Sequence, residues 1–315
     1  NVSFEKSFLA YFMPQAQWLD SIDVAKIAWP KEKSYSLSLL AKEKEIENPQ
    51  AHRALADAET TAFLLNKAKQ VIASFSREAL HNLYLMSAEG EGPFARYIFE
   101  IVSEQLLHLQ AIPMHGSPLF AAANEEAVSS KKKKKEEKEF IPLETDEIVS
   151  YFMEGGKGQS AYEQFEYRPQ QLEMAAAVTD CFNQGGILAA EAGTGTGKSL
   201  AYLLPSVLFA LQNGKRVGIS TYTINLQEQL LHKDIPMLQK WLQKEFSVAL
   251  LKGRNNYLCR RRWQLYAAQA EKETLPFYLR LGVWLTKTKT GDISELSLLG
   301  RDKFLWNTVA ATKEN

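Results

Sequence analysis

The segment AGTGTGKS, residues 192–199, has the residue types of a phosphate-binding loop. Its three glycines allow a tight turn in which backbone N–H groups converge on phosphate oxygens. Lys198 is then placed to reach the β- and γ-phosphates, and the Ser199 hydroxyl to hold Mg²⁺. The residues expected to bind a nucleoside triphosphate are Ala192, Gly193, Thr194, Gly195, Thr196, Gly197, Lys198 and Ser199. The general pattern has glycine where Ala192 stands, but this position mainly requires a small side chain.

Polar residues flank the loop on both sides. Upstream, Arg168 and Gln171 belong to YRPQQ; an amide presents a donor and an acceptor together, which suits the edge of adenine. A plain helix start, with proline near its first position, explains the same stretch. Downstream, STYTINLQEQ supplies neutral hydrogen-bonding groups suited to the phosphates of a single strand, although a helix cap with a polar face is the alternative. These downstream residues are Thr221, Thr223, Gln227 and Gln229.

A second constellation lies near the N-terminus, where His52 precedes Asp57 by five residues in AHRALADAE. At a helix start the two side chains can face one metal site. The carboxylate would then be a Mg²⁺ ligand and the imidazole a general base for water. A capping histidine or a surface pair is the alternative interpretation.

The surrounding elements divide the chain into zones. Residues 1–110 show mostly helical spacing of apolar side chains, and SSKKKKKEEKE lies in a stretch, 121–139, that is typical of a solvated linker. From residue 140 onward, strands expected at 187–190, 217–221 and 248–251 alternate with helices expected at 197–211 and 226–231. Such alternation predicts βαβ units and therefore an α/β fold with a parallel sheet.

The composition does not indicate a binding partner, but it does bear on the cellular compartment. Lysine plus arginine and aspartate plus glutamate both total 37, so overall charge does not indicate a nucleic-acid partner. Two cysteines and no secretory leader favour a reducing cytoplasm. The longest apolar run, 200–211, is too short to span a bilayer. We therefore expect a soluble cytoplasmic protein with no membrane partner.

Four stretches, FEYRPQQLEM, AEAGTGTGKSLAYLLP, ISTYTINLQEQL and LLKGRNNYLCRRRW, resemble the first motifs of the DinG/XPD branch of superfamily 2 DNA helicases. Alanine is usual in that family at the position of Ala192. The resemblance implies that Gln171 selects adenine, that 192–199 bind ATP with Mg²⁺, and that 221–229 contact single-stranded DNA. It also implies that Cys259 is the first of four iron–sulfur ligands. Because the other three are absent, this chain alone cannot hold a cluster.

The N-terminal part is similar to the DnaQ-like DEDDh 3′–5′ exonucleases, in AHRALADAE and in NVSFEKSFL. The resemblance implies an RNase H-like domain in which Glu5 and Asp57 are metal ligands and His52 is catalytic, with Mg²⁺ or Mn²⁺. Glu5 stands where this family usually has aspartate. Its longer arm alters metal geometry, which Mg²⁺ tolerates poorly.

Together the two resemblances predict an interior fragment of a DNA-processing enzyme that combines a 3′–5′ exonuclease with a helicase-like ATPase. We expect part of an exonuclease domain at 1–72, a helical connector at 73–120, a linker at 121–139, and part of a RecA-like P-loop domain at 140–315, with the start of a possible iron–sulfur region from 252. The fragment itself would be limited to binding ATP and DNA. The alternatives are an ATP-regulated exonuclease without helicase activity and an ATP-dependent DNA-binding protein that has lost its nuclease.

Overall fold

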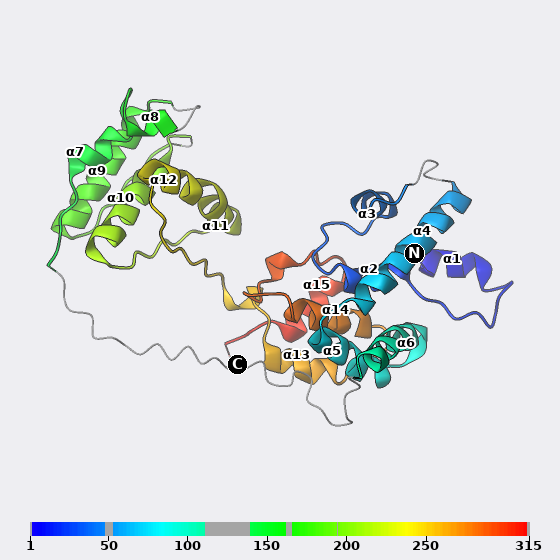
Figure 1. The fold of residues 1–315 in the computed structure, drawn as a ribbon. Helices are drawn as coiled ribbons and strands as arrows, with labels where there is room; N and C mark the ends of the chain where they lie inside the picture. The colour runs from blue at the N-terminus through cyan, green and yellow to red at the C-terminus, as the bar shows by residue number, and fades with distance from the viewer. Residues whose placement is uncertain (1, 48–52, 111–138, 162–165, 194, 314–315) are drawn as a thin grey trace. The chain divides into compact units, whose positions relative to one another are not determined.

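The computed structural model describes residues 2–47, 53–110, 139–161, 166–193 and 195–313. The chain forms two compact units, residues 1–129 with 253–315, and residues 130–252. Each unit is a set of packed helices (Figure 1). No helix within the described ranges has both the length and the apolar character needed to cross a membrane.

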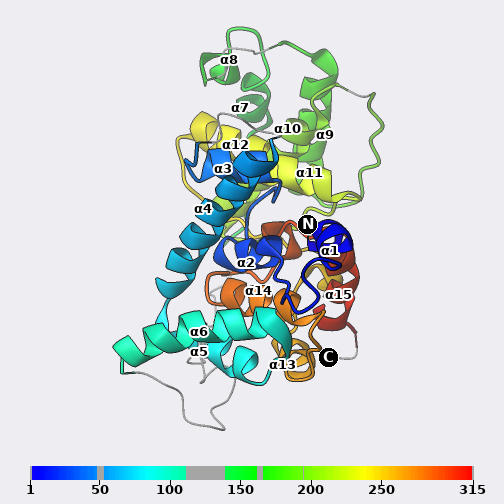
Figure 2. The ribbon, with the colours of Figure 1, turned by 90° about the vertical axis from the view of Figure 1, so that its right-hand side faces the viewer.

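The first unit contains helices from both ends of the chain. Its elements are α1 (Val2–Leu9), α2 (Ser21–Ala28), α3 (Leu37–Glu43), α4 (Ala54–Ala73), α5 (Arg77–Ala88), α6 (Gly92–His108), the 3-10 turn η2 (Arg254–Asn256), α13 (Arg260–Ala267), α14 (Leu275–Leu285), the 3-10 turn η3 (Ile293–Glu295) and α15 (Arg301–Val309). Helix α14 packs against both α2 and α5 (Figure 2). Residues 263–310 therefore share one apolar core with residues 24–106.

The second unit carries the glycine-rich loop. Its elements are α7 (Thr145–Ser150), α8 (Lys157–Ala161), α9 (Pro169–Gln184), α10 (Lys198–Asn213), α11 (Ile224–Gln229), the π-helical turn η1 (Leu230–Asp234) and α12 (Ile235–Leu242). Helices α9 and α10 lie side by side (Figure 1).

Two asparagine side chains tie the start of the second unit to this helix pair. The Asn213 amide accepts from the Ile141 N–H at 2.8 Å and donates to the Ile141 carbonyl at 3.0 Å. Asn183 makes the same pair of bonds with Leu143, at 2.7 and 2.8 Å. Each amide thus replaces the two partners that a neighbouring strand would offer.

Two local expectations are confirmed in this unit. The predicted helix at 197–211 is α10, which begins directly after Gly197 and ends at Asn213, before the left-handed Gly214. The helix predicted at 226–231 lies within α11 and the π-helical turn that continues it. The first helix follows from its flanking glycines, which take positive φ at little steric cost. The second begins after Thr223, whose side chain accepts a hydrogen bond from the Leu226 N–H.

The predicted α/β class with a RecA-like parallel sheet is wrong. Within the described part of the chain, β structure is limited to two isolated bridges, Tyr257 with Asp292 and Leu258 with Ala310. The segments 187–190, 217–221 and 248–251 form neither helix nor strand. They are also open to solvent: Ile187 is fully exposed and Leu251 is 80% exposed. Strands of a parallel sheet need neighbours on which to form a ladder and helices that cover both faces, and these segments have no such neighbours.

Candidate phosphate-binding site

Two glycines of the glycine-rich loop have a backbone conformation that is compatible with a phosphate cradle. Gly195 and Gly197 have φ angles of +81° and +76°, in the left-handed region that favours glycine. At Gly197 a Cβ atom would lie 2.3 Å from Nε2 of Gln171, so a larger residue cannot fit there without displacing that side chain. The loop leads directly into α10, whose first two residues are Lys198 and Ser199.

Lys198 folds back over the loop from which it emerges. Its Nζ donates to the carbonyl oxygens of Ala192 and Gly193, both at 2.6 Å. The Thr196 hydroxyl donates to the same Gly193 carbonyl at 3.0 Å. Among the described residues, the hydrogen-bond partners of the ammonium group are neutral carbonyl groups, with which a phosphate would compete.

Gln171 supports the loop from α9. Its side chain is 7% exposed, and its Nε2 donates to the Gly197 carbonyl at 2.9 Å. The neighbouring Arg168 occupies the N-cap position of α9, directly before Pro169, and pairs with Glu166. In this arrangement Gln171 contacts the phosphate loop itself, in addition to any role toward a base.

The loop opens onto a cavity of about 860 Å³, within the size range of small-molecule sites. One side is formed by 195–200 together with Glu166, Arg168 and Gln171, and the other by α11, η1 and α12. The second side carries residues that the sequence analysis did not identify. These are Leu226, Lys233, Asp234, Met237 and Trp241.

The π-helical turn η1 shapes the side of the cavity that is formed by α11, η1 and α12. Pro236 has no N–H, so the ordinary hydrogen bond to the residue four positions earlier cannot form. The helix widens instead, and the N–H of Ile235 bonds to the carbonyl of Leu230, five residues back. Single π-helical turns of this kind occur frequently at functional sites. The proline in HKDIP is therefore the sequence signal that could have drawn attention to Lys233 and Asp234.

Positively and negatively charged side chains and one unpaired hydrogen-bond donor line the cavity. Lys198, Lys233 and Arg168 line it, as does the Asp234 carboxylate, which is buried. The indole N–H of Trp241 is also buried and has no hydrogen-bond partner among the described residues. A polar ligand with negative charge would satisfy the lysines and offer an acceptor for the indole.

The residues predicted to contact single-stranded DNA take different positions. Thr223 caps α11 by accepting from the Leu226 N–H at 3.3 Å, and the Thr221 hydroxyl donates to the Thr223 carbonyl. Gln227 donates to the Leu251 carbonyl at 3.3 Å. Gln229 lines the cavity of the glycine-rich loop. The structure thus brings only Gln229 of this group to the cavity.

The predicted nuclease residues lie in the first unit. Glu5 belongs to α1 and is exposed, and Asp57 lies in the first turn of α4 and is half-buried. His52 and Thr194 lie outside the described residues. Across the described ranges, no three His, Cys, Asp or Glu side chains are gathered closely enough to hold a metal ion. The described residues therefore do not form the metal site that the nuclease resemblance implies.

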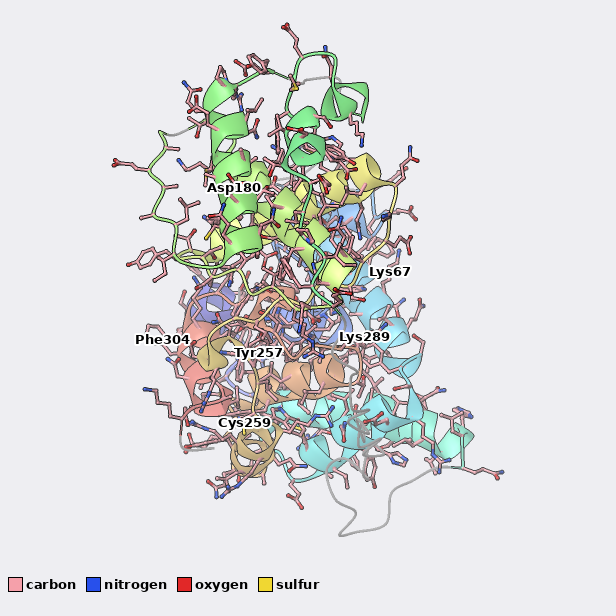
Figure 3. All side chains as sticks on the ribbon, turned by 90° about the vertical axis from the view of Figure 1, so that its left-hand side faces the viewer. Lys67, Asp180, Tyr257, Cys259, Lys289 and Phe304 are labelled. Carbon is pink, nitrogen blue, oxygen red and sulfur yellow. The ribbon has the colours of Figure 1, made fainter. Side chains whose placement is uncertain are left out.

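Cys259 stands directly before α13 and is half-buried (Figure 3). The other cysteine, Cys181, belongs to the second unit. Two thiols do not fit an iron–sulfur cluster, which requires about four. The region around Cys259 is instead held by its backbone, whose N–H donates to the Val309 carbonyl at 2.8 Å, and by Trp263, whose indole donates to the Tyr278 carbonyl.

Comparison with known proteins bears on the first unit most directly. Residues 3–65 match the RNase_T exonuclease family, a range that includes Glu5 and Asp57. Over 98% of its length the chain is 29% identical to a protein of Bacillus subtilis named 3′-5′ exonuclease DinG. It is 32% identical to the protein of the same name from Staphylococcus epidermidis over 96% of its length. The chain spans about a third of the length of these relatives. No solved structure matches it.

Proposed function

We propose that this chain binds ATP with Mg²⁺ at the glycine-rich loop and contributes to 3′–5′ exonucleolytic degradation of single-stranded DNA. The observation that carries the nucleotide half is the cavity on which the left-handed glycines, Lys198 and Ser199 converge. The nuclease half is supported by the exonuclease match at residues 3–65 and by the names of the relatives.

The chemistry of the loop fits a magnesium–nucleotide complex. Lys198 provides a positive charge for the β- and γ-phosphates once it exchanges its two carbonyl partners for phosphate oxygens. The Ser199 hydroxyl is a hard oxygen ligand of the kind Mg²⁺ uses together with phosphates and water. The start of α10 adds N–H groups that favour an anion at the same place. Bound Mg²⁺ would neutralise part of the phosphate charge.

Substitution of Lys198 by alanine tests the nucleotide half. A hydrogen bond to a charged group contributes about 1.5–3 kcal/mol, so affinity for a fluorescent ATP analogue should fall about 10- to 150-fold. Lys215→Ala is the matched control, because Lys215 is an exposed lysine of the same unit that does not line the cavity. Equal affinity of the Lys198 variant and the control would refute the assignment.

The nuclease half is tested in the full-length protein that contains this chain, with 5′-labelled single-stranded DNA in Mg²⁺ or Mn²⁺. We expect shortening from the 3′ end, and loss of this activity in Asp57→Asn and His52→Ala. Asp180→Asn, an exposed carboxylate on α9, serves as the control. If DNA is bound but never shortened in either metal, the alternative of an ATP-dependent DNA-binding protein without nuclease activity is favoured instead.

ATP-dependent unwinding of the DinG type is the second candidate, supported by the order of the four motifs around the loop. An unwinding assay of the full-length protein on a duplex with a single-stranded tail separates it from an exonuclease that ATP only regulates. Unwinding that requires ATP hydrolysis supports the motor. ATP-dependent changes in DNA degradation without strand separation support the regulatory role.

A further inference from the structure

The carboxylate of Asp234 belongs to the side of the nucleotide cavity that is formed by α11, η1 and α12. The residue is 4% exposed, and its Oδ2 accepts a hydrogen bond from Nε2 of Gln229 at 3.2 Å. Among the described residues this is the one hydrogen bond of the carboxylate, and none of their lysines or arginines forms an ion pair with it. A carboxylate has about four acceptor positions, so most of its acceptor capacity is left for a ligand in the cavity.

Gln229 adds a second acceptor beside this carboxylate. Because a carboxylate only accepts hydrogen bonds, the Gln229 amide turns its nitrogen toward Asp234. The amide oxygen, Oε1, then has no hydrogen-bond partner in the described part of the chain. Both residues line the cavity, so this side offers two neighbouring oxygen acceptors. Two such acceptors fit a ligand that carries two neighbouring hydroxyl donors.

A buried donor on the same side of the cavity also lacks a partner. Nε1 of Trp241 is buried and makes no hydrogen bond within the described ranges. Trp241 follows Asp234 by seven residues and Met237 by four, a spacing that puts the three on one face of a helix. All three line the cavity. This face therefore continues from the paired acceptors to an apolar and aromatic surface of the kind that lines small-molecule sites.

We propose that Asp234, together with Gln229, recognises the ribose hydroxyls of the nucleotide whose phosphates bind at the glycine-rich loop. The inference rests on the proposed function and assigns the sugar-binding residues of that site. A carboxylate repels phosphate oxygens, so the phosphates belong at Lys198 and the uncharged part of the nucleotide at Asp234. Ribose has two adjacent hydroxyl groups, at C2′ and C3′, and acidic side chains bind such hydroxyls in other nucleotide sites.

Deoxynucleotides test this assignment in the full-length protein that contains this chain. The ligands are β,γ-imido-ATP and its 2′-deoxy and 3′-deoxy forms, and affinity is measured by isothermal titration calorimetry with Mg²⁺. A site that hydrogen-bonds a hydroxyl discriminates against the analogue without it. The loss of a hydrogen bond to a charged group lowers affinity about 10- to 150-fold. At least one deoxy form should therefore bind about 10-fold or more weakly than the ribonucleotide.

The Asp234→Asn variant separates recognition of the hydroxyl from a general loss of structure. It should bind the ribonucleotide about as weakly as the unsubstituted protein binds the discriminated deoxy form, and it should bind that deoxy form with unchanged affinity. Asp180→Asn is the matched control, an exposed carboxylate on α9 that accepts from the Thr145 hydroxyl at 3.2 Å, and it should bind all three ligands normally (Figure 3).

A fourth ligand, the purine riboside analogue without the adenine amino group, distinguishes the sugar from the base. It keeps both hydroxyls, so Asp234→Asn should weaken its binding as much as that of β,γ-imido-ATP. Equal affinity of the unsubstituted protein for the ribonucleotide and both deoxy forms, an equal loss for all ligands in Asp234→Asn, or a loss that depends on the amino group would each overturn the proposal. Failure of the unsubstituted protein to bind β,γ-imido-ATP would instead refute the proposed function.

Discussion

Replacement of Arg280 by methionine removes a charge from the centre of the first unit. The guanidinium is fully buried, and its Nη2 donates to the Pro30 carbonyl at 2.7 Å and to the Tyr35 hydroxyl at 3.2 Å. It also reaches the Ser297 carbonyl at 3.3 Å and the Asp302 carboxylate at 3.4 Å. This one side chain therefore joins segments that are about 250 residues apart in the sequence.

The loss of stability follows from the groups that lose Arg280 as a partner when methionine replaces it. Asp302 keeps Lys26 as an ion-pair partner at 3.2 Å but loses its buried partner, and the Pro30 carbonyl loses its donor. Breaking a buried pair by removing one member costs about 3–5 kcal/mol. Methionine fills much of the volume of the arginine stem, so a cavity adds little. For a unit of this size, such a loss lowers the melting temperature by about 6–20 °C.

Tryptophan fluorescence during thermal unfolding is a suitable assay. Five of the six tryptophans belong to the first unit, and only Trp241 belongs to the second, so the signal reports mainly on the unit that contains Arg280. Arg261→Met is the matched control because Arg261 is exposed on α13. If the two variants melt within 2 °C of each other, the buried network of Arg280 does not hold the N-terminal and C-terminal helices together.

Three further predictions concern pH and the loop. Burial works to raise the pKa of Glu295, but hydrogen bonds from neighbouring side chains outweigh it and bring the pKa to about 2. The stabilisation of the folded protein by ionised Glu295 is therefore complete above pH 4.5 and is lost as pH falls toward 2. Glu295→Gln should reduce stability at neutral pH and flatten this acid decline. Burial raises the pKa of Tyr35 to about 12, so stability should fall between pH 10 and 12, and Tyr35→Phe should remove that part of the decline. Gly197→Ala should weaken nucleotide binding and destabilise the second unit by about 1–3 kcal/mol, because it combines positive φ with a clash against Gln171.

Each of these outcomes has a simple check. Urea unfolding at a series of pH values measures the two titrations, and a Glu295→Gln variant with an unchanged acid slope would contradict the first. For the tyrosine, an identical alkaline decline in Tyr35→Phe would contradict the second. Gly218→Ala is the control for the loop, since Gly218 has open space around it and lacks positive φ. A Gly197 variant as stable and as competent as this control would show that the loop is less constrained than its geometry indicates.

Local features of the glycine-rich loop could be predicted from sequence because they depend on a few neighbouring residues. Glycine alone adopts positive φ without a steric penalty, so the turn at 195–197 and the helix that follows at Lys198 were foreseeable. The cap at Thr223 is similarly local, since its hydroxyl bonds to the backbone three residues ahead.

The second wall of the cavity could not be predicted in this way. Trp241 and Asp234 are about forty residues from the loop in sequence, and only the packing of α12 and η1 against α10 brings them to it. The proline at 236 indicates an irregular helix, but it does not indicate which surface that helix faces. Burial depends on which elements meet, and periodicity within one element carries no such information.

The sequence by itself determined the turns of the glycine-rich loop, the helix that follows it and the resemblance of NVSFEKSFL and AHRALADAE to exonucleases, because these reside in short stretches of residue types. The tertiary structure alone decided that the apolar segments at 187–190, 217–221 and 248–251 form no sheet, and that residues 263–310 share a core with residues 24–106. Strand pairing and core formation join segments distant in the chain. Their free energy comes from contacts that no single segment contains.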